Sequence, residues 1–240
     1  QRQYETWWQL WCSRPDMRKA LTELPRYICS PRVAKYRLFR WLDKAILPDS
    51  ATVTIARADD TTFGILHSHF HELWALRMGT SLEDRPRYTP TTTFETFPFP
   101  IGLMPADTGD GIETLNSGAI IPTVAAEYRD HAIAIAEAAF QLNQLRENWL
   151  NPPEWIEHQP EIVAGYPDRI IAKPAFAAQL KQRTLTNLYN KKPAWLVNAH
   201  VKLDQAVVAA YGWENDAAEL NEAEILQRLL ALNLARKKAN

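Results

Sequence analysis

The sequence predicts an α+β protein in which a mixed α/β part is followed by an all-helical part. Short runs rich in β-branched and aromatic residues are confined to the first hundred residues. Apolar residues spaced three or four apart dominate from residue 121 onward. Residues 101–120 are rich in Gly, Pro, Asp and Asn, a composition typical of a connection. We therefore expect a first domain at 1–105, a linker at 106–120 and a helical region at 121–240.

The first part should begin with a helix and continue with strands. Residues 4–23 are rich in tryptophan and then basic, and we expect a helix in two pieces around Pro15. Residues 26–29, 33–41 and 51–56 are expected to be strands. The second of these runs partly alternates cations with apolar residues, as a half-exposed strand does.

A helix is expected next, with Asp60 as its N-cap and Gly79 at its end. Its apolar residues recur at helical spacing: Phe63, Leu66, Phe70, Leu73 and Trp74. Residues 80–100 are rich in Pro and Thr and should form a loop with a short strand.

The second part should contain one long helix, over 121–149, which Asn151-Pro152-Pro153 would end. Residues 150–174 are expected to be extended. Asn221 and Glu224 resemble a capping box for the last helix. Three further helices are expected, near 175–188, 196–211 and 222–236.

The composition is that of a globular protein. The 240 residues are 46% hydrophobic and 23% charged. The two cysteines, Cys12 and Cys29, argue against a disulfide framework and favour a reducing compartment. No apolar run approaches the roughly 20 residues that cross a bilayer, so no membrane partner is expected. The chain begins on Gln1 without an initiator Met, and we expect a fragment of a longer protein.

Positive charge is concentrated near the N-terminus. Residues 14–44 contain nine Lys or Arg and three acidic residues, a net +6 in a chain of net charge −1. Residues 26–40 contain five cations and no anion. Such a segment can be a nucleic-acid footprint or a solvated strand edge, and charge alone slightly favours the edge.

Two motifs invite an enzymatic interpretation that the surrounding residues do not support. His67 and His71 lie one helical turn apart, as in helical zinc sites, but no Glu stands where a metallohydrolase needs it, and a hydrogen-bonded histidine pair is favoured. Asn151-Pro152-Pro153 is similar to the Asn-Pro-Pro-aromatic loop of amino-methyltransferases, but Glu154 replaces the aromatic ring. We interpret it as a helix end, and we find no catalytic residues, metal site or cofactor site in the chain.

Arg85 and Arg87 flank Pro86 in the loop at 80–93, with Glu83 and Asp84 directly before them. Arg binds guanine O6 and N7 through two hydrogen bonds, and Glu or Asp accepts from cytosine N4. Side chains of this chemistry could therefore bind base edges. Without other evidence, an ordinary surface loop with local ion pairs is the favoured interpretation.

Four strings, in order, carry a resemblance that covers nearly the whole chain. They lie within Arg26–Phe39, Asp60–Trp74, Arg87–Pro100 and Arg183–Trp213. Together they resemble the C-terminal half of the MmeI-like (type IIL) DNA methyltransferases and restriction–modification enzymes. The strings are long, so this match is more specific than any single short motif.

The resemblance implies a target-recognition domain followed by a C-terminal helical region. An N6-adenine methyltransferase domain that uses S-adenosylmethionine would lie upstream, often preceded by a nuclease domain. The implied partners are double-stranded DNA and the protein's own upstream methyltransferase domain, in a bacterial or archaeal cytoplasm.

With that implication, the basic strands at 26–40 and the loop at 80–93 receive distinct expected roles. Contacts to DNA phosphates are expected from Arg32, Lys35, Arg37 and Arg40. Contacts to base edges are expected from Glu83, Arg85 and Arg87.

The alternative is a structural or docking module that contacts a partner subunit and has no DNA role of its own. The expected helix at 121–149 and the nine tryptophans are compatible with a partner groove.

Overall fold

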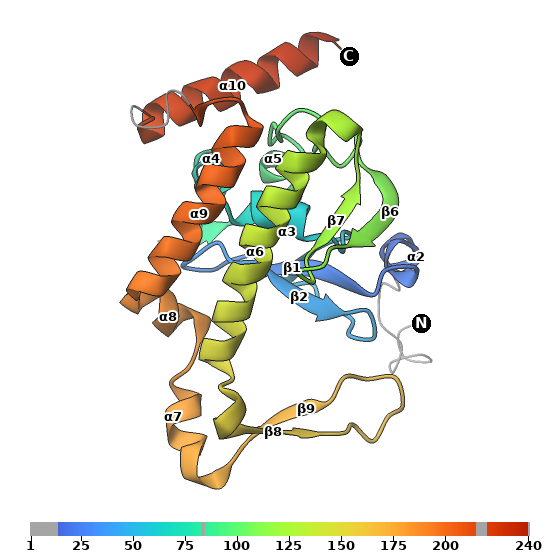
Figure 1. Ribbon diagram of the computed structural model, residues 1–240, viewed down its shortest axis with the longest axis vertical. Coiled ribbons are helices and arrows are strands. Elements are labelled where there is room, and N and C mark those ends of the chain that lie inside the picture. The colour runs from blue at the N-terminus through green and yellow to red at the C-terminus, as the bar shows by residue number, and fades with distance from the viewer. Residues whose placement is uncertain (1–13, 83–84, 215–219, 240) are drawn as a thin grey trace, which may run out of the picture.

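The computed structural model describes residues 14–82, 85–214 and 220–239, and it has the predicted α+β architecture (Figure 1). The predicted first helical piece, before Pro15, lies outside the described residues. The second piece is α2 (Pro15–Thr22), which begins at the proline because a fixed φ suits the first helical position. In this described part, no helix is both long and apolar enough to span a bilayer.

The central sheet is antiparallel, with strand order β2-β1-β3. Its strands are β1 (Arg26–Pro31), β2 (Arg40–Asp43) and β3 (Thr52–Ile55). Ile28 at its centre pairs with Trp41 on one side and Ile55 on the other. The first and third predicted strands are thereby confirmed.

The predicted strand at 33–41 is wrong for most of its length, since only its last two residues belong to β2. The cause is Arg37, whose guanidinium turns inward and donates to Ser30 Oγ (3.0 Å) and the Pro86 carbonyl (3.1 Å). A strand with regular alternation would direct this side chain along a sheet face, so internal hydrogen bonds override the pattern.

The helix predicted after Asp60 is two helices, α3 (Asp60–His67) and α4 (His69–Met78). They meet at Ser68, whose hydroxyl accepts from the His71 backbone N–H (3.4 Å) and so caps α4. Gly79 follows α4, as predicted.

The predicted N-cap is displaced by one residue. Asp59 caps α3 by accepting from the Thr62 backbone N–H (2.7 Å). Asp60 instead accepts from the Arg26 guanidinium (2.9 Å) and the Ile120 backbone N–H (2.8 Å). Asp60 therefore ties α3 to two other segments rather than to its own backbone.

Hairpins occupy the middle of the chain. The short strand predicted within 80–100 is a hairpin of β4 (Thr80–Leu82) and β5 (Arg85–Arg87), followed by α5 (Pro90–Thr93). The predicted linker carries β6 (Gly109–Thr114), which pairs with β7 (Ile120–Thr123).

The long predicted helix is α6 (Arg129–Leu150), preceded by a 3₁₀ turn at Ala126–Tyr128. It begins later than expected because residues 120–123 pair in β7. It ends at Asn151, as predicted. The extended region beyond contains two short 3₁₀ turns and the hairpin of β8 (Ile156–Gln159) and β9 (Arg169–Ala172), so the second part is not entirely helical.

The remaining predicted helices are confirmed, with the first divided in two. They are α7 (Ala177–Lys181), α8 (Leu185–Lys191), α9 (Ala194–Ala210) and α10 (Glu222–Ala239). The Glu224 backbone N–H donates to Asn221 Oδ1 (3.0 Å), which supplies the predicted cap for α10.

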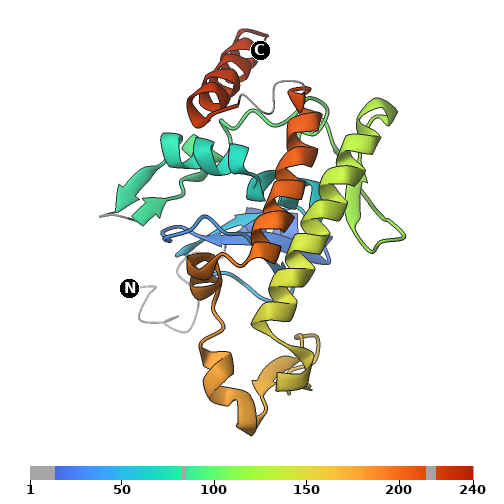
Figure 2. The same cartoon turned by 60° about the vertical axis from the view of Figure 1, so that its left-hand side comes forward.

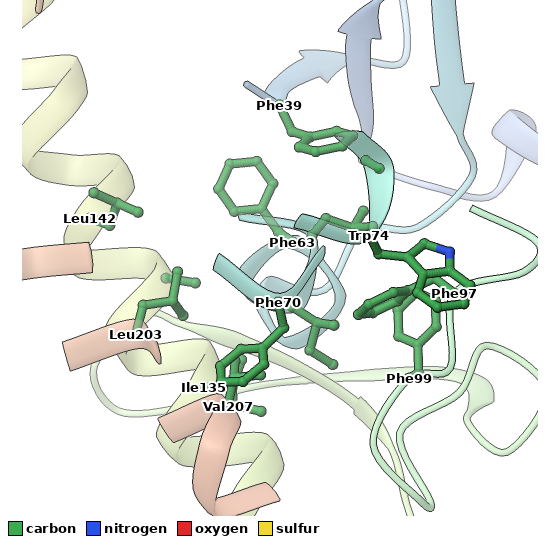
Figure 3. Packing of buried hydrophobic residues seen from close by; sticks show 14 of the residues in the cluster. Phe39, Phe63, Phe70, Trp74, Phe97, Phe99, Ile135, Leu142, Leu203 and Val207 are labelled. Atoms are coloured by element: carbon green, nitrogen blue, oxygen red, sulfur yellow. The ribbon is translucent and has the colours of Figure 1, made fainter. Parts of the chain in front are cut away.

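One apolar core joins both parts of the chain. Helices α6 and α9 lie side by side and pack on α3 (Figure 1). Figure 3 shows Leu142 from α6, Leu203 from α9 and Phe63 from α3 among the buried hydrophobic side chains. These residues belong to one buried cluster that crosses the expected boundary at 106–120. The domain division stays a prediction.

Gly64 marks the closest approach of α3 to the two long helices, and Gly64→Ala is expected to destabilise the protein by about 1–2 kcal/mol. An added Cβ would lie 2.7 Å from Ile135 Cγ2 and 2.9 Å from Ala139 Cβ. This overpacking exceeds the roughly 1 kcal/mol that alanine gains over glycine in a helix. Urea unfolding measures the change.

The matched test introduces Gly64→Ala into an Ile135→Ala background, where the atom at 2.7 Å is gone. The glycine substitution should then cost less than in the wild-type protein. An equal cost in both backgrounds would contradict the steric explanation.

Candidate nucleic-acid interface

The β4–β5 hairpin is joined to the basic segment at 31–37. The Tyr88 backbone N–H donates to the Arg32 carbonyl (2.7 Å), and Val33 forms an antiparallel bridge with Arg87. Figure 2 shows the hairpin projecting from the body beside this segment. The structure thus places Arg87 of the hairpin beside the segment that contains Arg32 and Lys35.

Arg37 corrects one of the phosphate predictions. Its side chain is only 7% exposed, and it donates to carbonyls of Pro31 and Pro86 as well as to Ser30 Oγ. The guanidinium also lies 4.9 Å from the Tyr88 ring centre. Desolvation lowers the pKa of Arg37 to about 10, so it stays charged at neutral pH. The buried Arg37 side chain links the basic segment to β5 through its hydrogen bonds. Because it is buried, a DNA phosphate cannot contact it in this structure.

The other three predicted phosphate ligands differ in their surroundings. Arg32 is partly exposed, with Nε donating to the Ser50 carbonyl (2.7 Å). Lys35 is exposed, and its Nζ donates to Asn190 Oδ1 (2.8 Å). Arg40 forms an ion pair with Glu147 of α6 (2.9 Å), which neutralises its charge. Arg32 and Lys35 therefore remain the stronger candidates of this set.

Arg85 and Arg87 are exposed on β5, on either side of Pro86. Residues two apart on a strand point to the same face, so both arginines are directed away from the face of Pro86. The Pro86 carbonyl accepts from the Ala34 backbone N–H and from Arg37, which fixes this strand to the body. Glu83, the third predicted base-reading residue, lies outside the described residues.

A buried hydrogen bond between Tyr88 and His71 fixes the end of β5 to α4. Tyr88 follows β5 and is 1% exposed, and its hydroxyl lies 3.0 Å from His71 Nε2. His71 Nδ1 lies 2.9 Å from the Leu66 carbonyl, which can only accept. Burial lowers the pKa of His71 to about 3, so the ring is neutral. Its Nδ1–H therefore donates to Leu66, and its Nε2 accepts the Tyr88 proton.

His67 is also neutral and internally bonded. Its Nε2 accepts from the Phe39 backbone N–H (3.1 Å) and from Arg146 Nη1 (2.8 Å), and its Nδ1 lies 3.1 Å from the Phe63 carbonyl. Burial, with Arg146 nearby, lowers its pKa well below the usual value. Both histidines are therefore hydrogen-bonded within the fold, as expected, each to other partners. The described residues contain no group of three or more metal-ligating side chains.

Sequence reasoning missed a second basic segment, at 169–203. It contains seven Lys or Arg and no Asp or Glu. The signal that could have found it is the length of chain without an acid, which the neutral net charge conceals. The structure joins it to the first basic segment, because Asn190 accepts from both Lys35 and Tyr36.

Comparison with known proteins adds independent findings. A family model described as the target recognition domain of MmeI matches residues 12–101. Among solved structures, the type IIL restriction–modification enzyme MmeI in complex with DNA is similar, with a TM-score of 0.57 and 22% identity. The match covers 89% of this chain and 21% of that chain, so this chain spans about a fifth of its length. At this identity the match shows the fold. No curated protein sequence matches significantly.

Proposed function

We propose, since this chain contains an MmeI-like target recognition domain, that it recognises a specific sequence in double-stranded DNA. The observation that carries the proposal is the pair of exposed arginines on β5, held by the buried Arg37 beside a basic segment. Arg37 and Tyr88 fix the hairpin before DNA arrives. A preformed hairpin loses little conformational freedom on binding.

The dimensions of the hairpin suit the major groove of B-DNA. That groove admits a two-stranded β-ribbon. Arg85 and Arg87 are separated by about 6.7 Å along a strand, close to the length of two base steps at about 3.4 Å each. Each guanidinium could bind the O6 and N7 atoms of a guanine, while Arg32 and Lys35 contact phosphates and fix the register.

We further propose that this chain positions the duplex for an upstream N6-adenine methyltransferase domain. That domain would bind S-adenosylmethionine and carry the catalytic residues. The place of Asn151 supports this division of labour, since its backbone N–H closes α6 and its side chain contacts Glu147. In this chain, Asn151 has the role of a helix end.

Arg85→Ala and Arg87→Ala are each expected to weaken binding to the preferred sequence by about 1–3 kcal/mol and to relax selection at one base pair. The loss of a two-hydrogen-bond contact to guanine is the physical reason. Selection from a pool of randomised duplexes, followed by sequencing, measures the change.

Lys35→Ala provides the comparison for this prediction. It should weaken binding to all sequences alike and lower the salt slope by about one. An unchanged selected sequence in both arginine variants would contradict the assignment of base reading to β5.

The second candidate function is docking to a partner protein without DNA contacts. The observation that favours it is the β8–β9 hairpin, whose tip exposes apolar side chains, including Ile162 (91% exposed) and Val163 (58% exposed). Strong salt-dependent DNA binding would count against this candidate. A tight protein complex that forms without DNA would support it.

A further inference from the structure

We propose that Lys191 and Lys192, at the end of α8, contact DNA phosphates that flank the recognised bases. The inference rests on the proposed DNA-binding function and adds the helical region to the interface. Duplex DNA would then be held between the β4–β5 hairpin and α8. The partner class is the sugar–phosphate backbone of a duplex, read without regard to sequence.

The charge pattern of the second basic segment leads to these two residues. Three of its seven cations serve the fold. Arg169 pairs with Glu161 (3.2 Å), and Lys173 Nζ donates to the Glu154 carbonyl (3.0 Å). Arg183 donates to the Trp149 carbonyl (2.9 Å) and lies over the Trp149 ring. The other four are exposed lysines: Lys181, Lys191, Lys192 and Lys202.

Contacts at Asn190 place two of these lysines beside the first basic segment. Asn190 Oδ1 accepts from Lys35 Nζ and from Tyr36 Oη, each at 2.8 Å. The rings of Tyr36 and Tyr189 lie 5.8 Å apart, which adds an apolar contact to the same junction. Lys191 and Lys192 follow Asn190 directly, so their backbone is fixed next to Lys35.

The same junction connects these lysines to the hairpin. The segment that contains Lys35 also contains Val33, which bridges to Arg87 of β5. In Figures 1 and 2 this segment lies between the hairpin and α8. A row of cations therefore runs from β5 across the segment to the end of α8.

Lys192 occupies a helix-end position that usually holds glycine. Its φ is 43° and its ψ is 60°, the left-handed region that glycine usually occupies after a helix. Neither Lys191 nor Lys192 forms an ion pair with a described residue. A lysine near a helix C-terminus commonly interacts favourably with the helix dipole. That interaction explains one lysine, but it explains neither a second adjacent lysine nor the absence of Asp and Glu from residues 169–203.

The test uses this chain, a fluorescein-labelled mixed-sequence duplex and anisotropy titrations at several salt concentrations. The double substitution Lys191→Gln/Lys192→Gln is expected to lower the salt slope by about two, since each phosphate contact contributes about 0.9. Affinity at about 50 mM salt should fall at least tenfold, while the sequence selected from a randomised pool stays the same.

Two control variants make the result specific. Lys19→Gln/Lys237→Gln removes the same charge from exposed positions on α2 and α10, far from α8 in Figure 1, and should leave the slope nearly unchanged. Lys191→Arg/Lys192→Arg keeps both charges and should restore the wild-type slope.

The possible outcomes separate the inference from the function on which it rests. A wild-type slope in the Lys191→Gln/Lys192→Gln protein, with sequence-selective binding intact, overturns the inference alone. An equal loss in the α2/α10 control also overturns it, since the effect would then follow net charge. Absence of salt-dependent binding by the wild-type chain at low salt overturns the inference and the proposed function together.

Discussion

Arg146→Ala is expected to destabilise the protein by about 3–5 kcal/mol. Arg146 lies on α6 with none of its surface exposed. Its Nη2 donates to the Phe39 carbonyl (2.9 Å), and its Nη1 donates to His67 Nε2 (2.8 Å). Alanine would leave a large cavity and a buried carbonyl without a donor. Urea unfolding, followed by tryptophan fluorescence, measures the loss.

Arg146→Met is the informative comparison, because none of the described carboxylates forms an ion pair with this guanidinium and its Nε has no partner. Burial lowers the pKa of Arg146, which shows that the charge is held at a cost. Methionine fills most of the space without that cost, so it should destabilise less than alanine. A loss below about 1 kcal/mol for alanine would contradict the structural role of Arg146.

The same substitution is expected to weaken the proposed DNA binding, since Arg146 joins α6 to Phe39, in the segment that contacts the β4–β5 hairpin. Phe39 accepts from Arg146 and donates to His67, and Phe39 also packs edge-on against Tyr88. Loss of the Arg146 contact therefore reaches the base of β5 within two residues.

Local sequence patterns were sufficient to predict helices whose buried residues recur at regular spacing. The apolar spacing of α6 and the cap at Asn221 were predicted from a few neighbouring residues. The prediction of a strand at 33–41 was wrong because its cations differ in burial. Arg37 is buried and bonds to Pro86, 49 positions away, and no local pattern distinguishes it from the exposed Lys35.

The candidate site was likewise predictable where neighbouring residues determine it and unpredictable where distant residues meet. The sequence indicated Arg85 and Arg87 through their chemistry, and Lys35 through local charge. The junction of Lys35 with Asn190 joins residues 155 positions apart. Such pairs depend on how α6 and α9 pack on α3, which lies beyond the reach of local periodicity. For that reason only the folded chain shows that the basic end of α8 lies beside Lys35.

Acidification is expected to destabilise the protein by about 4 kcal/mol between pH 6.5 and 4.5. Burial lowers the pKa of His71 to about 3 and that of His200 to about 4, and it lowers the pKa of His67 further below its usual value. In the unfolded chain all three titrate near pH 6.5. Unfolding below that pH therefore takes up protons, and stability falls as the pH decreases.

Two buried carboxyl groups act in the opposite direction and reduce this effect. Desolvation raises the pKa of Asp204 to about 6 and also raises that of Asp60, so the folded protein keeps protons that the unfolded chain releases. The net uptake on unfolding is then about one to two protons, each contributing about 1.4 kcal/mol per pH unit. Urea unfolding at a series of pH values between 7 and 4.5 gives this number from the slope.

Substitution of single histidines shows which side chain causes the change of the unfolding free energy with pH. His200 Nε2 lies 2.8 Å from the Tyr189 hydroxyl, and glutamine can replace it as the acceptor. His200→Gln should therefore lower the proton uptake by about one. His158→Gln, on the exposed surface of β8, should leave the curve unchanged. A flat stability profile in the wild-type protein would contradict the expected net uptake of one to two protons on unfolding.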